Sequence, residues 1–293
     1  MWKKILVVIL GLTAIIALAL VYGARRWQAE TTTMHAALEA ARLPLRPKTY
    51  SANELIGLPA PVQRYFRAAL TDGQPMVVAV SIEHTGTFNM DATGDQWKPF
   101  NSTQRVITQR PSFDWEARIA VLPGVPARVH DAYIGGEGIL HGSLFGLVSV
   151  ANLRGTPEAA RGELLRWFAE AAWYPTALLP SQGVQWTAVD DRSATATMQD
   201  GDTTVTLLFR FNADDMIDSI RAEARGALIG GVSVPTPWEG HWRNYELHDG
   251  MLVPSAGEVA WVFPAEPQPS PYWRGRITNI VYEFANYSDE QKC

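Results

Sequence analysis

An uncharged apolar run near the start of the chain limits what this sequence can be. Residues 5–22 (ILVVILGLTAIIALALVY) are 18 residues without a charged side chain. As a helix the run is about 27 Å long, close to the hydrocarbon thickness of a bilayer. The pattern predicts a membrane anchor over residues 1–26, with the lipid bilayer as the partner of Ile5–Tyr22.

Basic residues flank this run on both sides, Lys3 and Lys4 before it and Arg25 and Arg26 after it, so the positive-inside rule orients it only weakly. The short tail with two lysines favours a single pass through the bacterial cytoplasmic membrane with the main domain outside the cytoplasm. A cleaved signal peptide is the alternative, because residues 17–19 (Ala-Leu-Ala) have the small-x-small form. That site lies inside the apolar run, which favours an uncleaved anchor.

The remaining chain has the composition of an ordered acidic domain. Of 293 residues, 47% are apolar and eleven are tryptophan, which excludes disorder. Without the four basic residues that flank the run, 21 basic residues face 30 acidic ones, a net charge of −9. This charge argues against nucleic acid as a partner. The lone cysteine, Cys293, excludes an intrachain disulfide and a cysteine-based zinc site.

Sequence patterning divides the chain into three segments: an anchor (1–26), a stalk and linker (27–53) that spaces the body from the bilayer, and one extracytoplasmic domain (54–293). Apolar residues at helical spacing predict a helix over Leu55–Leu70. Thr156 followed by a proline predicts a second helix over Pro157–Trp173. From Met76 onward, alternating segments predict about nine or ten antiparallel strands.

These elements predict a mainly β domain of the α+β class. The clearest strand, residues 113–119 (FDWEARI), has an apolar face and a polar face that we expect to be solvated. So many strands cannot form a flat sheet, because strand twist curls it. We therefore expect a strongly curled antiparallel half-barrel whose concave face is covered by the two helices.

Several segments of the body are distinctive, above all GELLRWFAEAAWYPTALLPS (162–181) and TPWEGHWRNYELHDGMLVPSAGEVAW (236–261). Together they resemble a prokaryotic family of uncharacterised membrane-anchored proteins that is known only as a domain of unknown function. At the level of architecture, the expected half-barrel looks like the LolA/LolB lipoprotein carriers of the bacterial envelope. The chain has more large aromatic residues than one sheet face and two helices need, so we expect the concave face to form a cavity for a lipid or another apolar ligand. The resemblance implies no residue role.

Large aromatic residues and buried polar residues are the candidates for lining such a cavity: His84, Trp115, Asp131, Trp167, Glu170, Trp173 and Tyr174. Asp131 shares a strand face with apolar neighbours and needs a partner, most simply Arg105 or Arg118 on a nearby strand. Glu170 is expected to pair with Arg166, four residues before it in the helix.

Motifs for catalysis and for metal binding are missing from the sequence. It contains neither HExxH nor GxSxG, and Gly135–Gly138 is a turn rather than a phosphate-binding loop. We therefore predict no catalytic residue, no metal and no cofactor. Two alternatives to ligand binding stay open: a membrane-tethered hydrolase of envelope glycan or lipid that uses Glu170, Asp131 and His84, and a protein–protein interaction module of the envelope.

Overall fold

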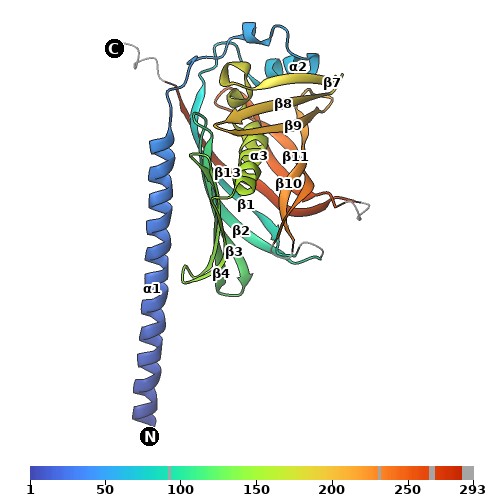
Figure 1. Ribbon diagram of the computed structural model, residues 1–293. Coiled ribbons are helices and arrows are strands. Elements are labelled where there is room, and N and C mark those ends of the chain that lie inside the picture. The colour runs from blue at the N-terminus through green and yellow to red at the C-terminus, as the bar shows by residue number, and fades with distance from the viewer. Residues whose placement is uncertain (92–93, 230–231, 264–267, 286–293) are drawn as a thin grey trace, which may run out of the picture.

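Thirteen strands form one open antiparallel sheet in the residues that the computed structural model describes, which are 1–91, 94–229, 232–263 and 268–285. Cys293 lies outside these ranges. The strand order is β6-β5-β4-β3-β2-β1-β13-β12-β11-β10-β9-β8-β7. β6 and β7 are the two edges, and the sheet curls between them as expected for a half-barrel (Figure 1).

The sheet consists of two meanders joined in its middle. The strands of the first meander are β1 (Val77–Asn89), β2 (Trp97–Ile107), β3 (Ser112–Leu122), β4 (Val125–Ile134), β5 (Glu137–Leu144) and β6 (Val148–Arg154). Those of the second are β7 (Gln185–Asp190), β8 (Ser193–Asp200), β9 (Thr203–Phe211), β10 (Ile217–Ile229), β11 (Val232–His248), β12 (Met251–Trp261) and β13 (Ser270–Phe284). β1 pairs with β13, with Ile82 opposite Ile280.

Three α-helices accompany the sheet: α1 (Trp2–Ala41), α2 (Ala60–Ala69) and α3 (Pro157–Glu170). Short 3₁₀ turns are η1 (Ala52–Leu55), η2 (Ala171–Trp173), η3 (Pro175–Leu178) and η4 (Pro180–Gln182). α2 packs near one end of the body against β8 and β12, and buries the residues that predicted it, including Val62, Tyr65 and Phe66.

α3 crosses the concave side of the sheet between its two edge strands (Figure 1). The Thr156 side chain accepts a hydrogen bond from the Ala159 amide, and Pro157 occupies the first turn, as the sequence predicts. Leu164 and Phe168 are fully buried against the sheet. The helix therefore supplies the concave face with the apolar cover that it needs.

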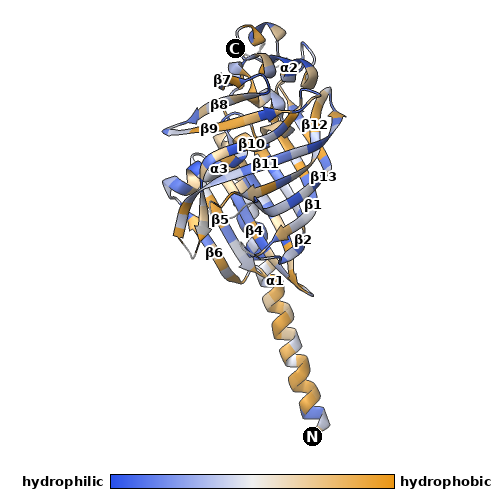
Figure 2. Ribbon diagram, turned by 90° about the vertical axis from the view of Figure 1, so that its right-hand side faces the viewer, coloured by the Kyte–Doolittle hydropathy of each residue, from blue (hydrophilic) through white to orange (hydrophobic). Residues whose placement is uncertain are grey.

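α1 is one continuous helix of 40 residues, and its two parts have different surroundings. The apolar part is exposed, and its most apolar window has a mean hydropathy of 2.9, enough for a candidate membrane span (Figure 2). Beyond it, α1 packs along the convex face of β2, β3 and β4, with Trp27, Met34 and Leu38 buried. This segment, which we expected to be a stalk, has an apolar stripe that the sheet covers.

The docked part of α1 also changes the environment of the polar strand faces. Asp114 is 1% exposed and His130 is fully buried. Trp27 stacks on the His130 ring at 4.5 Å, and its indole N–H donates to Glu116 Oε1 at 2.7 Å. The expectation of a solvated polar face on β3 is therefore wrong at Asp114 and Glu116, because a helix distant in sequence lies over them.

Candidate functional site

A cavity of about 460 Å³ lies between the concave face of the sheet and α3. This size is within the ~300–1,000 Å³ range of small-molecule sites. Its lining comes from β1, β3–β6, α3, η2 and β10–β13. The cavity is therefore built from both meanders and from the helix that connects them.

Indole rings form much of the cavity wall. Trp115 comes from β3, Trp173 from η2, Trp238 and Trp242 from β11, and Trp273 from β13. Positions 238 and 242 share a face with residue 240, because strand side chains alternate. The Trp173 and Trp242 rings pack edge to face with centroids 4.9 Å apart, a favourable aromatic geometry. Such a wall offers a large, rigid apolar surface to a ligand.

Arg166 organises the charges at the inner part of the cavity. Its guanidinium contacts Asp131 Oδ2 at 2.6 Å and Glu170 Oε1 at 2.7 Å, and it lies over the Trp115 ring with 5.0 Å to the centroid. Gln104 donates its side-chain N–H to the second oxygen of Glu170 at 2.6 Å. Burial of charges requires such pairing, since an unpaired buried ion is costly.

Arg225 on β10 forms a second buried ion pair with α3. Its guanidinium contacts Glu163 Oε1 at 2.9 Å and donates to the Gly162 carbonyl at 3.0 Å. It also lies over the Trp238 ring, 5.1 Å from the centroid, and donates to the Tyr272 hydroxyl at 3.3 Å. Arg225 thus joins the helix to the aromatic wall.

The three ion pairs of Arg166 and Arg225 contain three carboxyl groups and two guanidinium groups, so one carboxyl is not balanced. Burial, and then the neighbouring Asp131 carboxylate, raise the pKa of Glu163 to about 8. Near neutral pH this leaves Glu163 largely protonated, able to donate a hydrogen bond to Asp131 or to a polar ligand atom. A wall of this composition suits an apolar ligand with an uncharged polar group.

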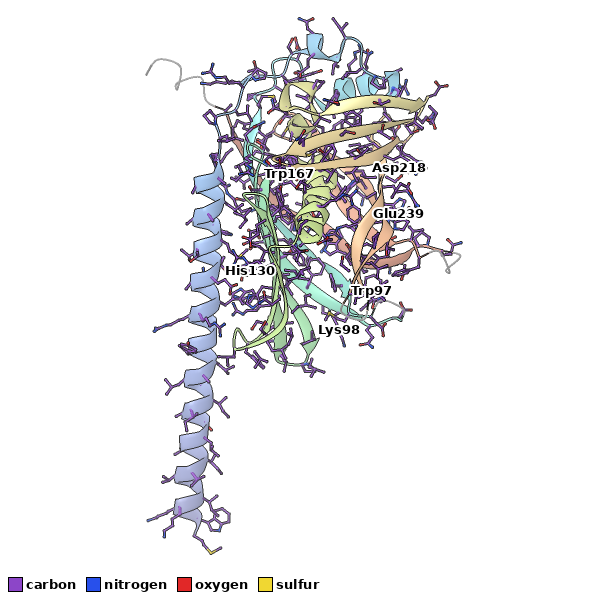
Figure 3. All side chains as sticks on the ribbon, viewed as in Figure 1. Trp97, Lys98, His130, Trp167, Asp218 and Glu239 are labelled. Atoms are coloured by element: carbon purple, nitrogen blue, oxygen red, sulfur yellow. The ribbon has the colours of Figure 1, made fainter. Side chains whose placement is uncertain are left out.

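Exposed lining residues mark the mouth of the cavity. Met90, Glu158 and Ser233 are exposed, whereas Glu170 and Trp173 at the other end of the lining are buried. Met90 directly follows β1, close to the start of β2. Figure 3 shows Trp97 and Lys98, the first residues of β2, at the end of the body from which α1 extends to its N-terminus. The mouth therefore lies on the side of the candidate span.

Four of the seven residues that the sequence indicated line the cavity, namely Trp115, Asp131, Glu170 and Trp173. His84, Trp167 and Tyr174 are not part of the lining. The His84 ring packs 4.9 Å from the Trp173 ring, and burial together with the Arg166 charge lowers its pKa to about 3, so it is neutral. Trp167 and Tyr174 are buried against each other, 5.5 Å between ring centroids.

The partner of Asp131 differs from the expected one. Neither Arg105 nor Arg118 contacts it, because their side chains lie on the convex side of the sheet, where Arg105 pairs with Glu39 of α1 at 2.8 Å. Arg166 on α3 is the partner instead. The expected pair of Arg166 with Glu170 is present.

Glu163 and Arg225 are site residues that the sequence analysis missed. Glu163, Arg166 and Glu170 follow one another at helical spacing, so their common side of α3 was visible in the sequence. Arg225 gave no such signal, since nothing local distinguishes it from the other arginines of the strands. Its role depends on where β10 meets α3.

A second polar cluster lies under α1. The Thr31 hydroxyl contacts His130 Nε2 at 3.1 Å, and His130 Nδ1 contacts Asp114 Oδ1 at 2.9 Å. The order hydroxyl, imidazole, carboxylate is that of a nucleophilic relay. All three side chains are buried between helix and sheet, so the cluster fastens α1 to the sheet. Within the described ranges, no three His, Cys, Asp or Glu side chains are grouped to hold a metal ion.

Comparison with known proteins gives a family and several solved structures. The model of a family of unknown function, DUF6920, matches residues 56–282. No curated protein matches the sequence.

Three solved structures are similar at low identity. A LolA superfamily protein from Nitrosomonas europaea is 9% identical with a TM-score of 0.41, over 78% of this chain and 95% of that one. A DUF1329 family protein from Desulfovibrio piger is 11% identical with a TM-score of 0.39, over 76% and 92%. A β-barrel-like DUF1849 protein from Brucella abortus is 10% identical with a TM-score of 0.24, over 71% and 99%. At these identities and TM-scores, the similarity assigns neither a ligand nor a residue role to this chain.

Proposed function

Because the chain belongs to this family of unknown function, DUF6920, whose description assigns no activity, we propose its function from the cavity. The protein is a membrane-anchored module that binds a lipid or another apolar ligand between its curled sheet and α3. The observation that supports this most directly is the tryptophan-walled cavity of about 460 Å³ with its mouth on the side of the candidate span.

The ligand is amphipathic in this proposal. Its apolar chain packs on the wall formed by Trp115, Trp173 and Trp242, where burial of apolar surface provides the free energy of binding. Its uncharged polar group lies near Glu163, which donates a hydrogen bond when protonated. A charged head group is disfavoured there, since with Glu163 protonated the two guanidinium groups already balance the Asp131 and Glu170 carboxylates.

The location follows from the anchor. Ile5–Tyr22 spans the bacterial cytoplasmic membrane once, with Lys3 and Lys4 on the cytoplasmic side and the body outside the cytoplasm. An apolar ligand of a protein held there is most simply taken from the bilayer itself.

A cavity-filling variant tests ligand binding. Gly240 lines the cavity, and a Cβ added there meets only the Glu258 carbonyl oxygen, at 3.9 Å, so Gly240→Leu fills open space. Native mass spectrometry of the full chain, released from lipid nanodiscs, is expected to show a retained lipid for the wild type. In the variant, the fraction of protein that carries a lipid is expected to be at least about tenfold lower, because the new side chain occupies space that the ligand needs.

The matched control is Ala188→Leu on the exposed face of β7, which should retain the lipid like the wild type. Thermal unfolding of both variants establishes that they are folded. Equal lipid occupancy in all three proteins, or none in the wild type, contradicts the proposal.

The hydrolase alternative has less support from the geometry. Arg166 pairs with both Asp131 and Glu170, and His84 lies outside the lining, so the three residues of the hydrolase alternative do not face one ligand together.

A further inference from the structure

Two hairpin tips at the cavity-mouth end of the body present apolar side chains to the surroundings. The β3–β4 tip has Leu122 at 62% exposure, followed by Pro123 and Gly124. Beyond the β5–β6 turn, Val148 and Val150 are 59% and 58% exposed. Exposed apolar groups clustered at one end of a domain indicate an interaction surface.

The position of these tips relative to the apolar span is fixed by the fold. Gly23, the first residue after the span, packs against the β5–β6 turn so closely that a Cβ on it would overlap the Phe145 carbonyl oxygen and the Leu147 side chain. Gly146, with φ at 71°, approaches the Gly23 carbonyl in the same way. Only glycine permits this contact. The β5–β6 turn therefore lies at the level where the span ends.

The β3–β4 tip extends past this level. Glu116 accepts a hydrogen bond from Trp27, which places this part of β3 beside the fifth residue after Tyr22. From Glu116 the strand continues for six residues to Leu122, about 20 Å. From Trp27 back to Tyr22 the helix covers only about 7.5 Å. Figure 1 shows β3 running alongside α1 toward this end, so the tip passes the end of the span.

Arginine side chains are positioned just above the apolar tips. Arg25 and Arg26 follow the span, and Arg118 and Arg128 are opposite each other on β3 and β4, two residues beyond Glu116 toward the tip. No ion pair joins any of these four to a carboxylate within the described residues. Cationic groups above an apolar end match the head-group and acyl layers of a bilayer surface.

We propose that the β3–β4 and β5–β6 tips insert into the interfacial layer of the bilayer that α1 spans. The inference rests on the proposed span and not on the ligand of the cavity. Lipid is the occupant of this surface, because the β5–β6 turn is continuous with the span through the Gly23 contact and the β3–β4 tip lies at the same end of the body. Insertion holds the cavity mouth at the membrane surface, where lipid enters without crossing water.

Depth-dependent quenching tests the insertion in the full chain. In a Cys293→Ser background, single cysteines replace Leu122, Val148, Leu12 within the span, and Val189 on β7, which is 55% exposed at the other end of the body. Each carries a bimane label, and the protein is reconstituted in vesicles of phosphatidylcholine and phosphatidylglycerol with brominated acyl chains. We expect the brominated chains to lower the bimane fluorescence at least twofold for the labels at positions 122, 148 and 12. The label at position 189 should show no decrease.

The controls separate this inference from the anchor and from ligand binding. If the label at position 12 is quenched but the labels at positions 122 and 148 are quenched no more than the label at position 189, the insertion is wrong and the anchor is unaffected. No quenching at Leu12 overturns the span and the insertion with it. Thermal unfolding of each labelled protein in detergent should match the parent, and lipid retention by native mass spectrometry is independent of all four labels.

Discussion

Arg166 is the side chain on which the charges of the cavity depend. It is the ion-pair partner of both Asp131 and Glu170, and all three groups are mostly buried. Arg166→Gln leaves two buried carboxylates without that partner, so we expect the free energy of unfolding to fall by about 3–5 kcal/mol. Chemical denaturation followed by tryptophan fluorescence measures this.

Arg154→Gln is the matched control for that change. Arg154 pairs with Glu137 at 2.9 Å, but both side chains are exposed, by 59% and 39%. An exposed pair of this kind contributes less than about 1 kcal/mol. Equal losses in the two variants would show that the buried pairs do not stabilise the fold.

Glu163 predicts a pH dependence of stability. Its pKa is raised from 4.5 to about 8 in the folded protein, so the folded state binds the proton more tightly than the unfolded state. The corresponding stabilisation is complete below pH 4.5 and is lost as the pH rises toward 8. We expect unfolding free energy to decrease over this window in the wild type and to decrease less in Glu163→Gln.

Denaturation at a series of pH values from 4.5 to 8.5 compares these slopes. Glu223→Gln, which removes a carboxyl that is 75% exposed, controls for the loss of a surface charge and should keep the wild-type slope. Parallel curves for the wild type and Glu163→Gln would contradict the prediction.

Individual site residues were predictable where local spacing fixes their direction. Alternation along β11 placed Trp238 and Trp242 on one strand face, which is the face that lines the cavity. The helical spacing of Arg166 and Glu170 predicted their pair, and it is present. Arg225 was not predictable, because its partner belongs to another element.

At the level of elements, α1 belongs partly to the body. Trp27, Met34 and Leu38 are at most 7% exposed, and burying each such side chain contributes about 1.5–3 kcal/mol. A chain shortened to begin at residue 23 keeps these contacts, whereas one beginning at residue 42 loses them and uncovers Asp114 and His130. We expect the longer chain to be more stable by several kcal/mol.

Thermal unfolding of the two shortened chains, followed by circular dichroism, compares them directly. The chain beginning at residue 42 is expected to unfold at a lower temperature or to aggregate. Equal unfolding temperatures would show that the docked part of α1 does not stabilise the sheet.

The sequence predicts about nine or ten strands and the sheet has thirteen, and β2, β5 and β6 have weak strand patterns for identifiable reasons. β2 begins with Trp-Lys-Pro, and a proline argues against a strand interior. β5 and β6 are short, and β5 contains Gly138 and Gly142, so their alternation is weak. Pairing decides their structure, since β2 pairs with β1 and β3, β5 pairs with β4, and β6 pairs with β5.

On the scale of the whole molecule, the curled sheet with an inner helix agrees with the expected half-barrel. The sequence patterns did not reveal that β13 returns to pair with β1 and so joins two meanders. The two-meander arrangement places the edges β6 and β7 on either side of α3, and the cavity lies between this helix and the sheet. The family resemblance seen in the sequence is confirmed by the family match.

The sequence by itself determined the apolar run, the alternation of the strands, the start of α3 and the two faces of each element, because these depend on neighbours a few residues apart. Only the tertiary structure decided which element covers each face. Asp131 meets Arg166 rather than Arg105, and Asp114 is buried rather than solvated, because α3 and α1 approach from distant parts of the chain. Periodicity gives the direction of a side chain, and long-range packing gives its partner.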